Sequence, residues 1–208
     1  MQHGGSHRGS RVATNARLRS PRRPSPIESV IEHRIGNVTL QLTVGDITNQ
    51  LDIDAVVNAA NAELRPGGGV AGAIHRAAGP GLAEECAPLA PIAPGECVIT
   101  AGYGLPNPHV IHCLGPVYGS DEPADKLLSN CYRGALELAD HKQLSSIAFP
   151  AISTGAFGYP AAEAAGVALR TISEVATRLE KVTVVRMVLY SQGDLEIHTE
   201  VLDELHTD

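Results

Sequence analysis

Two segments of the sequence contain residue types that could hold an anionic ligand. The first, "NAANAELRPGGGVAGAIH" (residues 58–75), places two asparagines before a run of glycines, and the second, "STGAFG" (residues 153–158), combines two hydroxyls with two glycines. Glycine lets the backbone approach a ligand closely and adopts positive φ angles at little cost. A helix expected over residues 70–78 would direct its N-terminal amides at the first loop. Backbone N–H groups could therefore cradle a pyrophosphate, although the residues alone also fit two simple tight turns.

The glycines formally match the dinucleotide-binding pattern G-x-G-x-x-G at Gly67, Gly69 and Gly72. That motif should follow its strand directly, with an acidic residue at the end of the next strand. Here "NAAN" and Pro66 separate the glycines from the preceding apolar run, and no such acid follows at the usual distance. The context therefore argues against a Rossmann site.

Histidines and cysteines offer other candidates for chemistry. His75 lies one turn into the expected helix and His112 lies within an apolar run, so we interpret both as structural. We expect Asn58 to brace its loop rather than contact a ligand. The four cysteines, at positions 86, 97, 113 and 131, show no zinc-type spacing and are interpreted as reduced, mostly buried thiols. The sequence predicts neither a metal site nor a cofactor.

Charge divides the chain into two parts. Residues 1–26 hold six arginines and no acid, whereas the rest holds ten basic and twenty-three acidic residues, a formal charge of −13. We predict a disordered basic arm over residues 1–34 and one folded domain over residues 35–208. The arm also has the composition of a transit peptide, and that alternative stays open. So acidic a domain is a poor candidate for direct nucleic-acid binding, and no apolar run is long enough for a membrane span, so we expect a soluble, cytoplasmic protein.

The hydrophobic pattern predicts strands alternating with helices. Short apolar or alternating runs typical of strands are "VTLQLTVG", "DAVVNAA", "VIHCL", "SIAFPAI" and "VTVVRMVLY". Apolar residues recur at helical spacing over residues 122–141 and 161–180. This alternation predicts an α/β fold, a three-layer α/β/α sandwich with a central mixed, mostly parallel sheet. In such sheets ligands bind at the carboxyl ends of the strands, so the loops that follow these strands should form the site.

Five motifs in these loops and strands give the chain a family resemblance. Their order and spacing resemble a macro domain, nearest to the MacroD-type and bacterial O-acetyl-ADP-ribose deacetylase-like branch, over about residues 37–207. The motifs are "GDIT" (45–48), "VVNAAN" (56–61), "GGGVAGAIHRAAG" (67–79), "IHCLGPVY" (111–118) and "PAISTGAFGYP" (150–160).

The resemblance implies an ADP-ribose site. At its adenine end, Asp46 would accept a hydrogen bond from the adenine amino group beside the Ile47 backbone. Leu195 stands at a position that is often aromatic and covers the adenine, which implies weaker stacking here. At its other end, Asn61 would hydrogen-bond the distal ribose and Phe157 would pack beside it. The pyrophosphate loop would comprise Ser153, Thr154, Gly155 and Ala156, and the opposite wall Gly68, Gly69, Val70 and Ala71.

The chain departs from the family at one position. Hydrolytic members read "GGVDG" where this chain reads "GGVAG", so Ala71 replaces an aspartate thought to position or activate a water. Loss of a general base costs about 10²–10⁴ in rate, while orientation of the water by Asn61 and the ligand can remain. The resemblance thus implies a hydrolase that releases ADP-ribose from protein carboxylates or deacetylates O-acetyl-ADP-ribose. The alternatives are a non-catalytic reader of free or protein-linked ADP-ribose and, less favoured, an ADP-ribose 1″-phosphate phosphatase.

Overall fold

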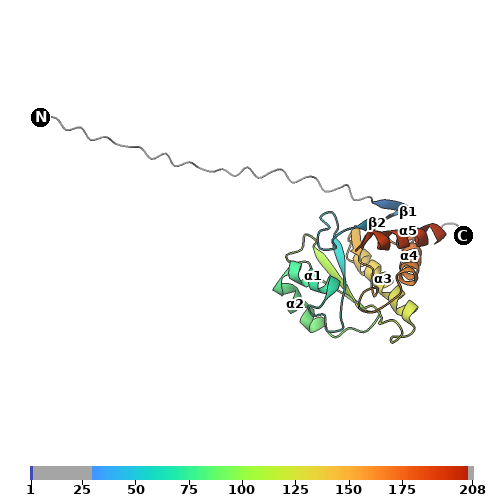
Figure 1. Ribbon diagram of the computed structural model, residues 1–208, viewed down its shortest axis with the longest axis horizontal. Coiled ribbons are helices and arrows are strands. Elements are labelled where there is room, and N and C mark those ends of the chain that lie inside the picture. Colours follow the sequence, from blue (N-terminus) through green and yellow to red (C-terminus); the bar gives the residue numbers. More distant parts are fainter. Residues whose placement is uncertain (2–29, 206–208) are drawn as a thin grey trace.

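The structure, a computed structural model, describes Met1 and residues 30–205 (Figure 1). The predicted basic arm lies almost wholly outside the described residues. Its predicted boundary is wrong, because residues 31–34 belong to strand β1 (Ile31–Ile35). The segment "IEHRI" alternates half-buried and exposed side chains, which is the pattern of an edge strand with one face on the core.

The described residues form one seven-stranded mixed sheet. Its order is β1, β2 (Val38–Val44), β7 (Val184–Leu189), β6 (Ser146–Phe149), β3 (Ala55–Ala59), β5 (His109–Cys113) and β4 (Cys97–Ala101). The five central strands run parallel, whereas β1 and β4 pair antiparallel at the two edges. The five predicted strands are these five central ones. The carboxyl ends of β2, β7, β6, β3 and β5 therefore all meet one edge of the sheet.

Helices cover both faces of the sheet, which confirms the predicted sandwich (Figure 1). On one face lie α1 (Gly69–Ala78) and α2 (Pro80–Cys86), followed by a short 3₁₀ turn (Ala87–Leu89). On the other lie α3 (Ala124–His141), α4 (Ala161–Ala176) and α5 (Gln192–Leu205). The predicted helices correspond to α1, α3 and α4, while α2, α5, β1 and β4 were not predicted.

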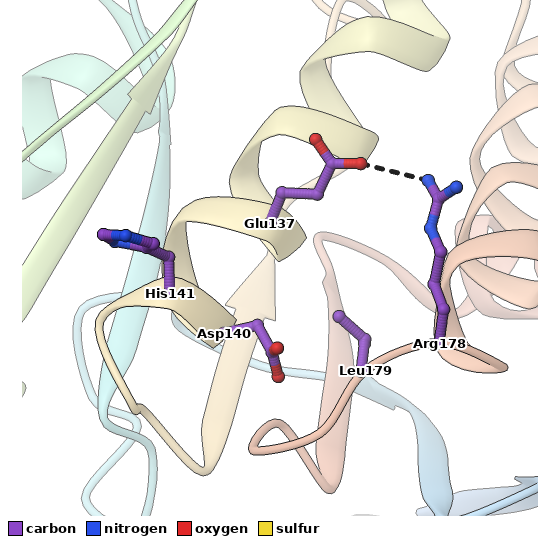
Figure 2. A pocket seen from close by; sticks show the side chains of 5 residues that line it. All are labelled: Glu137, Asp140, His141, Arg178 and Leu179. Carbon is purple, nitrogen blue, oxygen red and sulfur yellow. Dashed lines mark hydrogen bonds and ion pairs between the residues drawn. The ribbon is translucent and has the colours of Figure 1, made fainter.

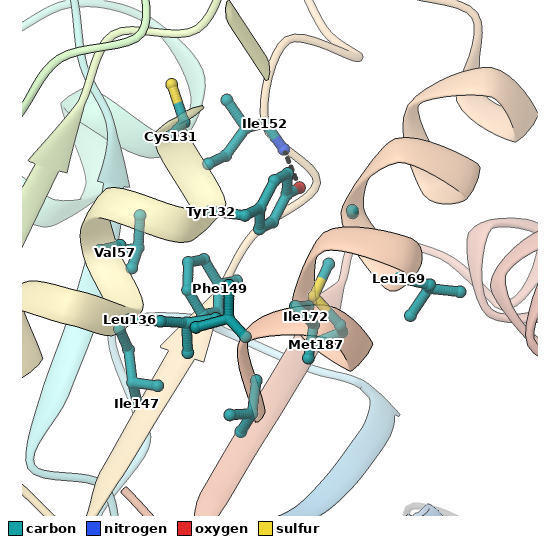
Figure 3. Packing of buried hydrophobic residues seen from close by; sticks show 14 of the residues in the cluster. Val57, Cys131, Tyr132, Leu136, Ile147, Phe149, Ile152, Leu169, Ile172 and Met187 are labelled. Atoms are coloured by element: carbon teal, nitrogen blue, oxygen red, sulfur yellow. Dashed lines mark hydrogen bonds between the residues drawn. The ribbon is translucent and has the colours of Figure 1, made fainter. Parts of the chain in front are cut away.

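The larger core, between the sheet and α3, α4 and α5, supports the loop that follows β6 (Figure 3). The ring of Tyr132, on α3, packs 5.1 Å from the ring of Phe149. The Tyr132 hydroxyl accepts a hydrogen bond from the Ile152 amide at 3.2 Å and donates to the Pro150 carbonyl at 3.5 Å. A buried side chain therefore fixes the start of the loop at residues 150–159 from beneath.

Candidate functional site

Loops from five strands line up along the carboxyl edge of the sheet in a defined order. We call residues 45–48, 190–195, 150–159, 60–70 and 114–118 the carboxyl-edge loops; they follow β2, β7, β6, β3 and β5, in the spatial order of those strands. The sequence segments predicted to form the site thus lie along one edge. Arg65 is the single Lys or Arg within these loops, so an anion bound here would depend mainly on backbone dipoles.

At the β2 end, Asp46 forms a tight turn with an exposed carboxylate. Its Oδ1 accepts hydrogen bonds from the Thr48 amide at 2.8 Å and the Thr48 hydroxyl at 2.7 Å. The next residue, Ile47, is buried and packs into the core on the α1 side of the sheet. The adjoining strand end is close, because the Gly45 amide donates to the Leu189 carbonyl at 3.0 Å. The turn thus presents a fixed carboxylate beside the end of β7.

An exposed aromatic side chain at the carboxyl end of β7 is Tyr190, which the sequence reasoning missed. Tyr190 directly follows β7 and is 95% exposed, whereas Leu195 is 3% exposed and packs into the core between α5 and the sheet. The expectation that Leu195 covers a bound base is wrong, since its side chain is buried beneath the edge. An aromatic residue at the carboxyl end of an apolar strand was the signal that could have identified Tyr190.

In the middle of the edge, residues 153–159 form a closed loop. The Gly158 amide donates to the Gly155 carbonyl and the Tyr159 amide to the Ser153 carbonyl, both at 3.0 Å. Ser153 adopts a φ of +66°, unusual for a residue with a side chain, and its hydroxyl is buried without a hydrogen-bond partner. Strained backbone clusters at active sites and ligand clamps, and a buried hydroxyl without a protein partner can complete its hydrogen bonding with a ligand.

The loop at residues 114–118 packs closely against this middle loop. A Cβ at Gly115 would collide with the Ser153 hydroxyl and lie 2.6 Å from a methyl group of Ile152. On the outer side, the Tyr118 amide donates to the Phe157 carbonyl at 2.9 Å, and the Tyr118 hydroxyl donates to Glu163 at 3.0 Å. Phe157 itself is half-buried against the core on the α1 side. The two loops therefore hold each other in place.

At the β3 end, Asn61 braces its own loop. Its Nδ2 donates to the Arg65 carbonyl at 2.7 Å, and its Oδ1 accepts from the Arg65 amide at 3.1 Å. Each amide atom retains one further hydrogen-bonding position, and Asn61 is half-exposed. The structure thus shows a loop-organising role for Asn61 and leaves it able to contact a ligand.

Helix α1 begins at Gly69 with an open N-terminus. Its N-cap, Gly68, provides no side-chain hydrogen bond, and its first turn holds no acid. Gly68 and Gly69 are exposed and Val70 is half-buried, so the first backbone amides are not screened by large side chains. An uncapped helix N-terminus without a nearby carboxylate favours an anionic ligand.

Ala71 lies in that first turn and is 5% exposed. The methyl group points to the core side of α1, and His75, one turn later, is buried on the same side. Both ring nitrogens of His75 are buried without a partner, and burial lowers the pKa of this side chain. The first turn of α1 therefore holds no carboxylate that could deprotonate water, and the imidazole behind Ala71 is buried.

Asn58 and His112 form a buried network beneath the β3 end, as the structural interpretation predicted. His112 Nδ1 lies 3.0 Å from Asn58 Nδ2, and His112 Nε2 lies 2.9 Å from the Thr100 hydroxyl. Burial, with a smaller contribution from His75, lowers the pKa of His112 to about 3. A neutral imidazole thus ties β3, β5 and β4 together.

The cysteines of the described part of the chain do not form a metal centre or a disulfide. All four cysteines are free and three are buried. The residues that the structure describes contain no group of three or more His, Cys, Asp or Glu suited to a metal ion, and none of their helices is long and apolar enough to cross a membrane.

A surface hollow lies elsewhere, at the C-terminal ends of α3 and α4 (Figure 2). Arg178 and Glu137 form a 3.0 Å ion pair there, with both side chains about half exposed. Asp140 accepts backbone hydrogen bonds from Glu180, Lys181 and Val182. These groups brace a connection at the amino edge of the sheet, so we place the functional site at the carboxyl edge instead.

Comparisons with a family model and with known proteins all indicate the same family. The model of the "Macro domain" family matches residues 57–168. The chain is 47% identical to "O-acetyl-ADP-ribose deacetylase" of Salmonella gallinarum over 79% of this chain and 94% of that protein. It is 45% identical to "ADP-ribose glycohydrolase MACROD2" of Xenopus laevis over 77% of this chain and 39% of that protein.

Solved structures agree. The macrodomain of Oceanobacillus iheyensis with ADP is 43% identical and superposes with a TM-score of 0.82 over 86% of this chain and 97% of that one. A mutant of the same macrodomain with ADPR gives a TM-score of 0.83 at 42% identity, covering 86% and 100% of the two chains.

Proposed function

The chain belongs to the macro domain family, and on that premise we propose that it binds ADP-ribose along its carboxyl-edge loops and hydrolyses ADP-ribosyl or O-acetyl esters. The observation that carries the proposal is the middle loop, where the orphaned Ser153 hydroxyl and strained backbone lie beside the other carboxyl-edge loops. The similarity to a deacetylase and a glycohydrolase supports the hydrolytic part.

We assign each part of the ligand to one of these loops, following their order along the edge. Asp46 and the Ile47 backbone would bind the adenine, and Tyr190 would stack on it. The loop Ser153, Thr154, Gly155 and Ala156 would hold the pyrophosphate, assisted by the N-terminal amides of α1. Asn61, Phe157 and the segment Gly68–Ala71 would surround the distal ribose. This assignment places the negative charge where backbone amides are concentrated.

Hydrolysis at this site would depend on orientation rather than on a protein base. A water attacks the ester between the distal ribose and its acyl group; one bond to oxygen forms, the ester bond breaks, and ADP-ribose leaves together with the free carboxylic acid. The ligand's own phosphate can accept the proton of that water, and Asn61 can hold it in place. Ala71 lowers the rate without removing the binding site.

A second candidate function is that of a reader, which binds ADP-ribose on proteins without releasing it. The buried Ala71 methyl in the position of the usual aspartate favours it. The partners in either case would be ADP-ribose, its derivatives and ADP-ribosylated proteins, met in the cytoplasm.

One experiment separates the two functions. The purified full chain is incubated with a glutamate-ADP-ribosylated protein and with O-acetyl-ADP-ribose, and ADP-ribose binding is measured by calorimetry. Release above the buffer rate supports the hydrolase, and micromolar binding with no release would assign the reader. Absence of both binding and release would reject an ADP-ribose function.

A further inference from the structure

A buried charge lies in the middle of the sheet, in strand β7. Val185 and Met187 point into the core shared with α3 and α4, so Arg186, between them, points to the opposite face. Its side chain is only 12% exposed. A buried guanidinium is costly unless its N–H groups are paired, so its partners reveal why it is tolerated.

Arg186 donates to three side chains, one on β2 and two in the loop between β2 and β3. Its Nη1 and Nη2 form a two-pronged ion pair with Asp52 at 2.8 and 2.7 Å. Its Nε donates to Gln41 Oε1 at 2.8 Å, and Nη1 also donates to Gln50 Oε1 at 2.9 Å. Such forked, charge-assisted contacts fix direction as well as distance. The guanidinium thus holds the loop between β2 and β3 against the sheet.

Gln50 carries this constraint to Asp46. While Gln50 Oε1 accepts from Arg186, its Nε2 donates to the Asp46 carbonyl at 2.8 Å. The backbone of Gln50 is held separately, because Asn107 Nδ2 donates to the carbonyls of Gln50 and Ile53 at 2.7 and 2.6 Å. Gln50 is buried, so its side chain has few alternative partners. A continuous series of hydrogen bonds therefore runs from the centre of β7 to the residue proposed to read the base.

We infer that Arg186 is a positioning residue for nucleobase recognition, acting through Gln50 on Asp46 without touching the ligand. The inference rests on the proposed function, in which the Asp46 carboxylate accepts a hydrogen bond from the exocyclic amine of adenine. Because that contact is directional, a displaced Asp46 loses preference for adenine over a base without the amine. The pyrophosphate and distal ribose contacts come from other loops and stay unchanged.

The test compares two ligands that differ at the base. ADP-ribose and inosine diphosphate ribose, which has a carbonyl in place of the amine, are titrated by calorimetry into the full chain and into Arg186→Met. We expect the Kd for ADP-ribose to rise about tenfold, the effect of roughly one well-placed hydrogen bond. The Kd for inosine diphosphate ribose should change by about twofold or less. An equal loss for both ligands, or no loss for ADP-ribose, overturns the inference.

Two further variants keep the test decisive. Gln50→Met breaks the same connection while Arg186 keeps its contacts with Asp52 and Gln41, and it should reproduce the selective loss even if Arg186→Met folds poorly. Arg178→Met is the matched control, because Arg178 forms its ion pair with Glu137 at the opposite edge. It should bind both ligands as the unmodified chain does.

Hydrogen exchange separates failure of this inference from failure of the proposed function. Without any ligand, amides of residues 46–50 should exchange about tenfold faster in Gln50→Met, while those of residues 153–159 keep their rate. If the unmodified chain does not bind ADP-ribose, the proposed function fails, yet this exchange result still tests whether Arg186 and Gln50 hold the Asp46 loop. Unchanged exchange at residues 46–50 contradicts that role.

Discussion

The two ends of the carboxyl edge differ in the groups that they present. At the β2 end, hydrogen bonds from side chains predominate: the Thr48 hydroxyl donates to the Asp46 carboxylate, Gln50 Nε2 donates to the Asp46 carbonyl, and Gln50 Oε1 accepts from Arg186. At the β3 end, glycines, a methyl group and an open helix N-terminus predominate, and Asn61 bonds to backbone. From this difference we propose that the first end selects a ligand by specific hydrogen bonds, whereas the second end positions the reacting group by shape and backbone dipoles. The following predictions test this contrast, beginning with the largest effect.

A carboxylate at the β3 end should change the chemistry most. In Ala71→Asp the new side chain lies in the first turn of α1, where a negative charge is also favourable. We expect turnover of a glutamate-ADP-ribosylated protein to rise about 100-fold, the lower part of the range for a general base. Ala71→Asn is the control of equal size without the base and should give no comparable gain. An unchanged rate in Ala71→Asp would mean that water activation does not use this position.

The middle of the edge should respond strongly to added bulk. Gly115→Ala introduces a Cβ that collides with Ser153 and Ile152, and relief of such overpacking costs about 1–3 kcal/mol. We expect the Kd for ADP-ribose to rise about 30-fold because the Ser153 loop shifts. Gly134→Ala, whose Cβ would lie 3.4 Å from Cys97 Sγ, is the control. Equal affinities in both variants would remove the Ser153 loop from the site.

Loss of the exposed aromatic at the β2 end should have an intermediate effect. Stacking of a base on an aromatic side chain contributes about 1–3 kcal/mol, so Tyr190→Ala should raise the Kd for ADP-ribose about tenfold. The melting temperature should stay the same, because Tyr190 is 95% exposed. Tyr103→Ala, at another exposed tyrosine, serves as the control. Unaltered binding in Tyr190→Ala would leave the adenine without this platform.

Mild acid should lower the stability of the protein slightly, through a residue at the β3 end and not through one at the β2 end. The pKa of His112 is lowered to about 3, first by burial and second by His75, so the unfolded chain takes up protons below pH 6.5 that the folded chain does not. Stability is therefore lost as the pH falls, by about 1 kcal/mol between pH 8 and pH 6. His112→Gln should reduce this dependence in urea titrations by that amount, while His75 and His198, whose pKa values burial also lowers, keep the remainder. At the other end the Arg186 hydrogen bond lowers the pKa of Asp52, which stays ionised over the same range. A dependence that is equally steep in His112→Gln would argue against His112 as its source.

Sequence patterns predicted the fold where periodicity was strong. The central strands and the helices α1, α3 and α4 were visible, because buried parallel strands read as short apolar runs. Strand β1 was missed because its five residues include Glu32, His33 and Arg34 next to an arginine-rich segment. Helix α5 was missed because Leu195, His198 and Leu202 are its only fully buried side chains. Short or mostly polar elements form through tertiary contacts, which a local pattern does not record.

The candidate site was predicted in outline, since the edge rule for parallel strands located its loops. Its internal contacts were not, because they join distant residues: Arg186 meets Gln41 and Gln50 across 145 and 136 positions. The single arginine in "VTVVRMVLY" was the visible signal of a largely buried guanidinium. The exposure of Tyr190 and the burial of Leu195 depend on how α5 packs against the sheet, so position in the family motif alone could not show which of the two side chains is exposed.

Hydrogen exchange of the full chain with and without ADP-ribose tests most directly whether one ligand joins the two ends. We predict slower exchange in three separate segments at once, residues 46–50, residues 67–72 and residues 153–159, with no change around Asp140 and Arg178 at the opposite edge. Protection confined to one end, or located at the amino edge, would contradict the account.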